Sequence, residues 1–326
     1  MAVERVHRMS FAVDAAAPAA VLYGLVADST HWPLYVPATV HVERLDFDGT
    51  RDRYSLWAGA DGDVRQSVWR RTLDAERLRI DFHQEVPAAP VTSTGGSWTV
   101  DELAPGWSRL TLEQYVTIAG NRASDVERTR AATEADSRAA LARFRELAER
   151  WDRLDGLRLA FEDSVRIEGP VAEPVYAFLY DIGAWPGRVP HIVRADVTED
   201  RPGIQRVATD TLTLDGSVRT ADSVRLCFPA AGRIVHKQTR PTALLAAHTG
   251  EWSVLPDTTG VTVVSQHEVL LDETMVERVL GPDADLEQAR RHVREALGRE
   301  SEAVLRMARQ HARDSAPDQV RALRVL

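Results

Sequence analysis

The chain has 326 residues, 44% of them hydrophobic and 27% charged, which suits two globular domains of ordinary composition. The formal net charge of −9 argues against nucleic acid as a partner, because phosphate binding needs concentrated lysine and arginine. The single cysteine, Cys227, excludes an intrachain disulfide framework and favours a reducing, cytoplasmic location. We expect neither a signal peptide nor a membrane span, because the N-terminal segment has no continuous apolar run and no window approaches about eighteen apolar residues.

The first half of the chain begins as a strand and ends as a long helix. Residues 10–28 (SFAVDAAAPAAVLYGLVAD) pass from apolar/polar alternation, through a proline, into apolar residues at helical spacing. A Trp-Pro turn follows in THWPLYVPATV (30–40). Turn signals at Asp48-Gly49 and Asp61-Gly62 then separate the strands of a predicted antiparallel meander. A buried apolar stripe predicts a long helix over about 122–152.

The second half repeats this order of elements. GAWPGRVPHIV (183–193) carries Trp, Pro, Val, Pro and Val at the spacing of the first Trp-Pro segment. GEWSV (250–254) repeats GSWTV (96–100), further turn signals lie at Asp215-Gly216 and at 257–260, and a second long helix is predicted over about 284–312. Units of this length are too long for a solenoid, so the pattern indicates a duplicated domain.

The duplication predicts two domains, 1–153 and 154–326, of α+β class. Each is expected to be one strand, a short helical segment, a meander of about six antiparallel strands and a long C-terminal helix that the curved sheet wraps around. We expect a monomer whose two halves pack as a pseudo-symmetric pair.

Short motifs in both halves resemble one enzyme family. The order of elements is similar to the helix-grip fold of START-type lipid-transfer and polyketide-cyclase domains. DSTHWPLYVP and DIGAWPGRVP resemble the Trp-Pro segment of the aromatase/cyclases of bacterial type II polyketide synthases. The strand that carries that family's pocket arginine is similar to SVWRRTLD and DSVRLCFP. The strand that places a Gln or His in the family's pocket is similar to VVSQHEV. Two such domains fused head to tail resemble the di-domain aromatase/cyclases.

The resemblance implies an enzyme of aromatic polyketide antibiotic biosynthesis. It would direct aldol closure of the first ring (C7–C12), its dehydrative aromatisation, or both, on a carrier-bound chain and without a cofactor. Its partners would be the acyl carrier protein and the ketosynthase and ketoreductase subunits. Family members act on unreduced or on ketoreduced chains, and a proton-transferring histidine favours the second kind. The alternative is a carrier or chaperone that binds a hydrophobic polyketide or lipid without chemistry.

By the same resemblance, the pocket arginine is Arg71 in the first half and Arg225 in the second. A fixed guanidinium can stabilise negative charge that develops on oxygen during ring closure. Strand alternation gives a competing interpretation, because the apolar residues around Arg225 lie on the opposite face and favour solvent for the arginine (Val218, Val224, Leu226 and Phe228).

Gln114 and His267 map to the strand that places a polar side chain in the pocket. A histidine with a pKa near neutral can transfer the proton that dehydration requires, whereas glutamine can only orient a carbonyl. The difference suggests that the two pockets are no longer equivalent.

Six further residues are candidates for substrate binding: Trp32, Trp69, Trp98, Trp185, Trp252 and Gln266. The indoles could line a cleft for planar rings. The competing interpretation for Trp32 and Trp185 is structural: each would belong to a turn that fixes the helix onto the sheet.

Cys227 is interpreted as a residue that fills space in the core and not as a reactive thiol. The sequence has no zinc-type cysteine pair, His-Glu-x-x-His or glycine-rich nucleotide loop, so we expect no metal or cofactor.

Overall fold

The computed structural model describes residues 5–59, 63–213 and 216–322, and the side chains up to residue 315. Three residues of the predicted turns, Asp61, Gly62 and Asp215, lie outside this part of the chain.

The chain divides into two compact units, Met1–Asp155 and Gly156–Leu326. This division and the boundary predicted at 153/154 both fall within one short helix, α4 (Trp151–Leu157).

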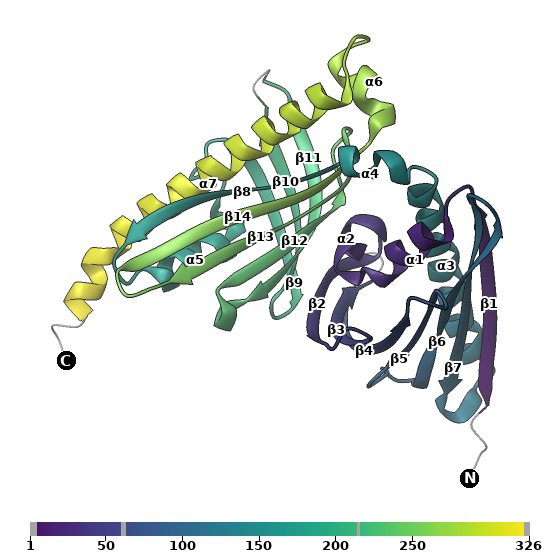
Figure 1. The fold of residues 1–326 in the computed structure, drawn as a ribbon. Helices are drawn as coiled ribbons and strands as arrows, with labels where there is room; N and C mark the ends of the chain where they lie inside the picture. The colour runs from purple at the N-terminus through teal and green to yellow at the C-terminus, as the bar shows by residue number, and fades with distance from the viewer. Residues whose placement is uncertain (1–4, 60–62, 214–215, 323–326) are drawn as a thin grey trace. The chain divides into compact units, whose positions relative to one another are not determined.

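The first unit is one seven-stranded antiparallel sheet with helices packed on it (Figure 1). Its strands are ordered β1-β7-β6-β5-β4-β3-β2, so the six strands β2 to β7 form a meander and β1 pairs with the last of them. The elements are β1 (Val6–Ala15), α1 (Ala19–Ala27), η1 (Ser29–His31), α2 (Trp32–Tyr35), β2 (Thr39–Phe47), β3 (Arg51–Ala58), β4 (Arg65–Asp74), β5 (Arg79–Gln84), β6 (Val91–Ala104), β7 (Trp107–Ile118), η2 (Ala119–Asn121) and α3 (Ala123–Ala148).

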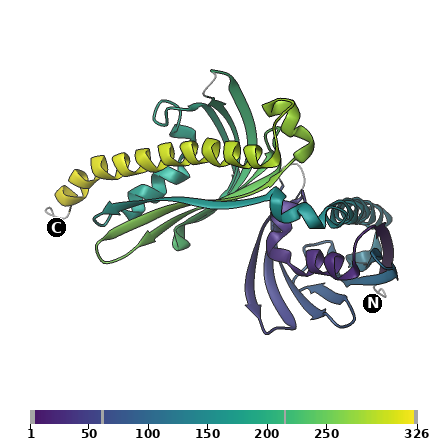
Figure 2. The ribbon, with the colours of Figure 1, turned by 45° about the horizontal axis from the view of Figure 1, so that its top comes forward.

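The second unit repeats this topology, with strands ordered β8-β14-β13-β12-β11-β10-β9. Its long helix α7 contacts β8 and β14 and runs along its sheet in both views (Figures 1 and 2). The elements are β8 (Arg158–Glu168), α5 (Ala172–Tyr180), η3 (Ile182–Ala184), β9 (Ile192–Arg201), β10 (Ile204–Leu212), β11 (Val218–Phe228), η4 (Pro229–Ala231), β12 (Arg233–Arg240), β13 (Leu245–Pro256), β14 (Gly260–Leu271), η5 (Glu273–Met275), α6 (Val276–Leu280) and α7 (Leu286–Ala322).

The predicted helix-grip architecture, α+β with a meander and a long terminal helix in each half, is therefore confirmed. The helices bury most of the predicted apolar stripe, with Leu141 and Phe144 in α3 and Val293 and Val304 in α7 all less than 5% exposed. Ala139, which the pattern also placed in the stripe, is exposed. The prediction for α7 was ten residues too short at its C-terminal end, because the backbone stays helical to Ala322. No helix in the described ranges is long and apolar enough to cross a membrane.

A glycine stands at the same place in both sheets, where two strands approach closely. Gly96 pairs with Gln114, and Gly250 pairs with His267. A Cβ at Gly96 would lie 1.9 Å from the carbonyl oxygen of Glu113, and one at Gly250 would lie 2.4 Å from that of Gln266. Glycine is required at these points, which fixes the strands that present Gln114 and His267 to the interior.

Candidate functional site

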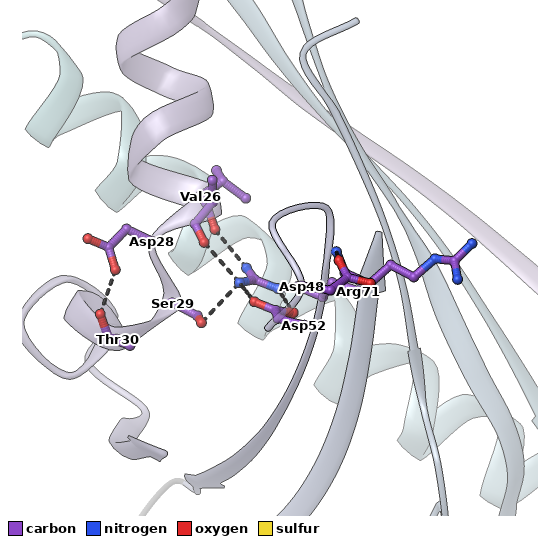
Figure 3. A network of polar contacts seen from close by, with 9 residues as sticks. Val26, Asp28, Ser29, Thr30, Asp48, Asp52 and Arg71 are labelled. Atoms are coloured by element: carbon purple, nitrogen blue, oxygen red, sulfur yellow. Dashed lines mark hydrogen bonds and ion pairs between the residues drawn. The ribbon is translucent and has the colours of Figure 1, made fainter. Parts of the chain in front are cut away.

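Arg71 joins the sheet of the first unit to the end of helix α1 (Figure 3). Register places it directly opposite Asp52 on β3, and its Nε donates to Asp52 Oδ1 at 2.9 Å. One terminal nitrogen donates to the Val26 carbonyl at 3.1 Å. The other donates to the Ala27 carbonyl at 2.9 Å, to Ser29 Oγ at 3.1 Å and to the second oxygen of Asp52.

This geometry gives Arg71 a structural role. The carbonyls it binds are those left unpaired at the C-terminus of a helix, where a positive charge is favourable. Burial opposes its charge, but the hydrogen bond to Asp52, together with the neighbouring acidic groups, outweighs burial, so the pKa of Arg71 is raised. All three guanidinium nitrogens already donate to protein oxygens, so the predicted role in binding substrate oxygen stays a prediction that these contacts do not favour.

Arg225 repeats this arrangement in the second unit. It donates to the carbonyls of Leu179 and Tyr180, at 2.5 and 3.2 Å, where helix α5 ends. Its partner across the strands is Gln205, whose Oε1 accepts at 2.7 Å. Arg225 is only 3% exposed, so the solvent-facing interpretation of strand alternation was wrong. The reason is that Val224, on the other face of β11, is buried as well, so alternation cannot tell the two faces apart.

The two arginine sites differ in one important group. Asp52 neutralises Arg71 directly, whereas Gln205 is uncharged and passes the interaction on to Glu199, which accepts from Gln205 Nε2 at 3.0 Å. Burial accordingly lowers the pKa of Arg225. In the second unit the carboxylate of Glu199 thus reaches the buried guanidinium of Arg225 only through Gln205.

His267 faces the interior and lies in a group of polar side chains. Its Nε2 is 2.7 Å from Ser301 Oγ on α7 and 3.2 Å from Ser265 Oγ. Its Nδ1 is 3.0 Å from His248 Nε2, and the third imidazole, His236, lies close by. Burial lowers the pKa of His267 to about 4, so the sequence-based assumption of a near-neutral pKa was wrong for this environment.

Gln114 takes the equivalent place in the first unit. Its Oε1 accepts from Ser137 Oγ at 2.6 Å, as His267 contacts Ser301, so both predicted polar residues face the long helix of their own unit.

Gln266 does not face the long helix of its unit. It is exposed and reaches Glu162 at 3.4 Å, because neighbouring residues on a strand point to opposite faces. This exposed position does not favour the predicted role of Gln266 in substrate binding, which stays a prediction.

The three candidate tryptophans of the first unit belong to one chain of ring contacts. Trp69 contacts Phe82 with ring centroids 5.9 Å apart, and Phe82 contacts Trp98 at 6.5 Å. Trp98 meets Phe144 edge-on at 5.8 Å, and Phe144 contacts Trp32 at 6.4 Å. The interior of this unit therefore presents aromatic faces from the sheet, the Trp-Pro segment and helix α3.

Among these indoles, Trp32 has a buried N–H without a hydrogen-bond partner in the described part of the chain. The N–H of Trp69, by contrast, donates to Ser67 Oγ at 2.9 Å. A buried donor without a partner is costly and calls for an explanation, such as a ligand that binds there.

Trp185 and Trp252 belong to the hydrophobic core of the second unit. They meet edge-on at 6.5 Å, and the Trp185 N–H donates to the Phe178 carbonyl at 3.0 Å. The structural interpretation of the second Trp-Pro segment fits this packing, and substrate contact by either indole stays a prediction.

Sequence reasoning missed His236 and His248. They lie on different strands from His267, with no recognisable spacing between them. A signal was available, however: alignment of the two halves places them opposite Phe82 and Thr94, so all three histidines are specific to the second half.

Cys227 lies in the core of the second unit and is 7% exposed, as its interpretation as packing required. Burial raises the pKa of its thiol from 9.0 to about 11. The thiolate fraction near pH 8 should fall about 100-fold, so we expect native protein to react with Ellman's reagent at least that much more slowly than urea-unfolded protein. Equal rates would show that the thiol is accessible.

Comparison with known proteins agrees with this architecture. Residues 15–145 match the family described as polyketide cyclase / dehydrase and lipid transport. The chain is 35% identical over 308 residues to the granaticin polyketide synthase bifunctional cyclase/dehydratase of Streptomyces violaceoruber, and this alignment spans 94% of each protein. The actinorhodin polyketide synthase bifunctional cyclase/dehydratase of Streptomyces coelicolor is 36% identical, over 93% of this chain and 96% of that protein. This chain belongs to the polyketide cyclase/dehydratase family.

Solved structures of di-domain aromatase/cyclases extend the agreement to both units. The di-domain aromatase/cyclase BexL of the BE-7585A biosynthetic pathway is 36% identical, with a TM-score of 0.84 over 94% of this chain and 98% of that one. StfQ of the steffimycin pathway is 30% identical, with a TM-score of 0.81 over 95% and 99% of the two chains. The family therefore accounts for the whole duplicated architecture.

Proposed function

We propose that this chain is an aromatase/cyclase that closes the first ring (C7–C12) of a carrier-bound polyketide, aromatises it by dehydration, or does both. The observation that carries the proposal is similarity along the whole duplicated chain to proteins named as bifunctional polyketide cyclase/dehydratases. The acyl carrier protein would present the substrate, and the ketosynthase and ketoreductase subunits would act before this chain.

The first unit supports a role in positioning. A flexible polyketone can close between several pairs of carbons, and holding one folded conformer selects one closure. The ring faces from Trp69 to Trp32 would pack on the chain, the buried N–H of Trp32 would donate to a substrate carbonyl, and Gln114 would orient a second one. Arg71 and Arg225 would act indirectly, by fixing the helix ends beside the Trp-Pro segments.

The second unit supports a role in the loss of water. Dehydration removes a hydroxyl, which aldol addition or an earlier ketoreduction supplies, together with a proton from the neighbouring carbon. His267, with its contacts to Ser301 and His248, is the candidate for handling that proton. The dehydratase names of the relatives favour a substrate that carries a hydroxyl.

The alternative, a carrier for a polyketide or lipid, is favoured by the reference to lipid transport in the matched family's description. This alternative predicts that the chain binds the polyketide or lipid but leaves the products of the synthase unchanged.

Product analysis of a reconstituted synthase tests the proposal. We expect an aromatic first ring only when this chain is added to ketosynthase, carrier protein and ketoreductase, and a set of misclosed products without it. Omitting the ketoreductase then separates the two substrate kinds. An identical product profile with and without the chain would contradict the proposal.

A further inference from the structure

Three histidines from neighbouring strands converge inside the second unit. His236 lies on β12, His248 on β13 and His267 on β14. One ligand-capable nitrogen from each lies within 4.8 Å of the others, and His248 Nε2 is 3.0 Å from His267 Nδ1. The cluster is built by strand pairing alone, since no two of its members are close in sequence.

We propose that His236, His248 and His267 form a binding site for a divalent transition-metal ion, with Zn²⁺ as the first candidate. Imidazole is a preferred ligand of zinc, copper and nickel, and three histidines are a sufficient protein ligand set for zinc. Three neutral ligands leave a fourth position for water or for an oxygen of a bound molecule.

The distances fit such a site after small side-chain shifts. Zinc–nitrogen bonds of about 2.0–2.1 Å place tetrahedral ligand atoms about 3.3–3.4 Å apart. His248 and His267 are already near this separation, and no gap in the cluster has to close by more than about 1.5 Å. His236 reaches the cluster because it packs on Gly250, where a Cβ would lie 2.7 Å from its Cε1.

Two ring nitrogens of the cluster, His236 Nδ1 and His248 Nδ1, are buried and have no hydrogen-bond partner within the described ranges. Buried polar atoms normally have partners, so the cluster is short of them. His248 faces His267 through Nε2, so Nε2 would be its metal ligand and Nδ1 would carry the proton. Each neutral imidazole has one lone pair, which a metal ion can accept.

The surroundings of His267 match the environment of a metal ligand. Metal-bound histidines usually donate their second ring N–H to a fixed acceptor, which sets the tautomer. Here His267 Nε2 lies 2.7 Å from Ser301 Oγ on α7, so its Nδ1 is directed toward His248. With Nδ1 as the metal ligand, Nε2–H would donate to the serine.

The first unit shows what the same positions look like without the cluster. Register places Phe82, Thr94 and Gln114 where the second unit has the three histidines. The serine on the long helix is present in both units, as Ser137 and Ser301. The three histidines are thus confined to one of the two units. A metal-bound His267 would have no free lone pair for the proton of dehydration, so the metal site is an alternative to that role of His267, but it does not depend on the ring closure proposed for this chain.

Metal titration of the full chain, prepared with chelator and without a histidine tag, tests the site. We expect about one equivalent of Zn²⁺ to bind by calorimetry with micromolar affinity or better, and Co²⁺ to give visible absorption bands typical of tetrahedral coordination. The variants His236→Phe and His267→Gln introduce the residues of the first unit. Each should weaken binding by at least about 100-fold, while His292→Gln, on the exposed side of α7, should bind as the parent does.

Circular dichroism of both variants checks their folding, and two variants keep the test valid if one fails to fold. A further expected result is a metal-dependent rise in the melting temperature of the parent that both folded variants lack. The absence of saturable binding to the parent would overturn the proposal, as would unchanged affinity in a folded cluster variant.

Discussion

Replacement of Asp52 by alanine is expected to lower the free energy of unfolding of the first unit by about 3–5 kcal/mol. The side chains of Asp52 and Arg71 are each 1% exposed, so the substitution leaves a guanidinium buried without its counter-charge. Urea denaturation of the full chain, with peptide-resolved hydrogen exchange, would assign the loss to α1, β3 and β4.

Gln205→Ala is the matched control, because Gln205 occupies the same register in the second unit. It removes a hydrogen bond to Arg225 but no charge, and should cost about 1.5–3 kcal/mol. A smaller effect for Asp52→Ala than for Gln205→Ala would contradict the structural role that we assign to the Asp52–Arg71 pair. It follows from that role that lost activity in Arg71→Ala would not by itself identify a catalytic arginine.

Replacement of Trp32 by phenylalanine is expected to lower the rate of ring closure by about 100-fold. In the free protein the Trp32 N–H has no partner in the described part of the chain, so its removal costs no hydrogen bond there. The smaller ring should reduce the free energy of unfolding by only about 1 kcal/mol. Rates of product formation and urea denaturation, measured on the same preparation, would separate the two effects.

Trp107→Phe serves as the control, because Trp107 lies in the same unit and is 42% exposed. It should keep both the rate and the stability of the parent. A Trp32→Phe variant that closes the ring at the parental rate would show that the unpaired N–H does not bind substrate.

The fold could be predicted from the sequence because its signals are local and occur twice. The stripe in the long helices, the turns and the Trp-Pro segments each have a copy in the other half, so a weak pattern was tested against its repeat. The C-terminal part of α7 escaped prediction because polar residues and a proline follow Ala312 in the sequence, which normally signal the end of a helix, whereas the backbone stays helical to Ala322.

The candidate site was harder to predict because it depends on what covers each face of a strand. Alternation put Arg225 in solvent, yet β11 is buried on both faces at that point. Besides Asp52 and Ser29, Arg71 binds two carbonyls at the end of a helix, and no sequence pattern encodes such a contact. His236 and His248 were overlooked because only the pairing of three strands brings them to His267.

Turnover on the carrier-bound substrate tests most directly whether this chain is a catalyst. Limiting amounts of the chain would be mixed with excess acyl carrier protein bearing a ketoreduced polyketide, and the carrier would be followed by intact-protein mass spectrometry. We predict that many equivalents of the carrier-bound chain lose water for each molecule of this protein. Conversion that stops at one equivalent, or proceeds at the rate without protein, would contradict catalysis and favour a carrier.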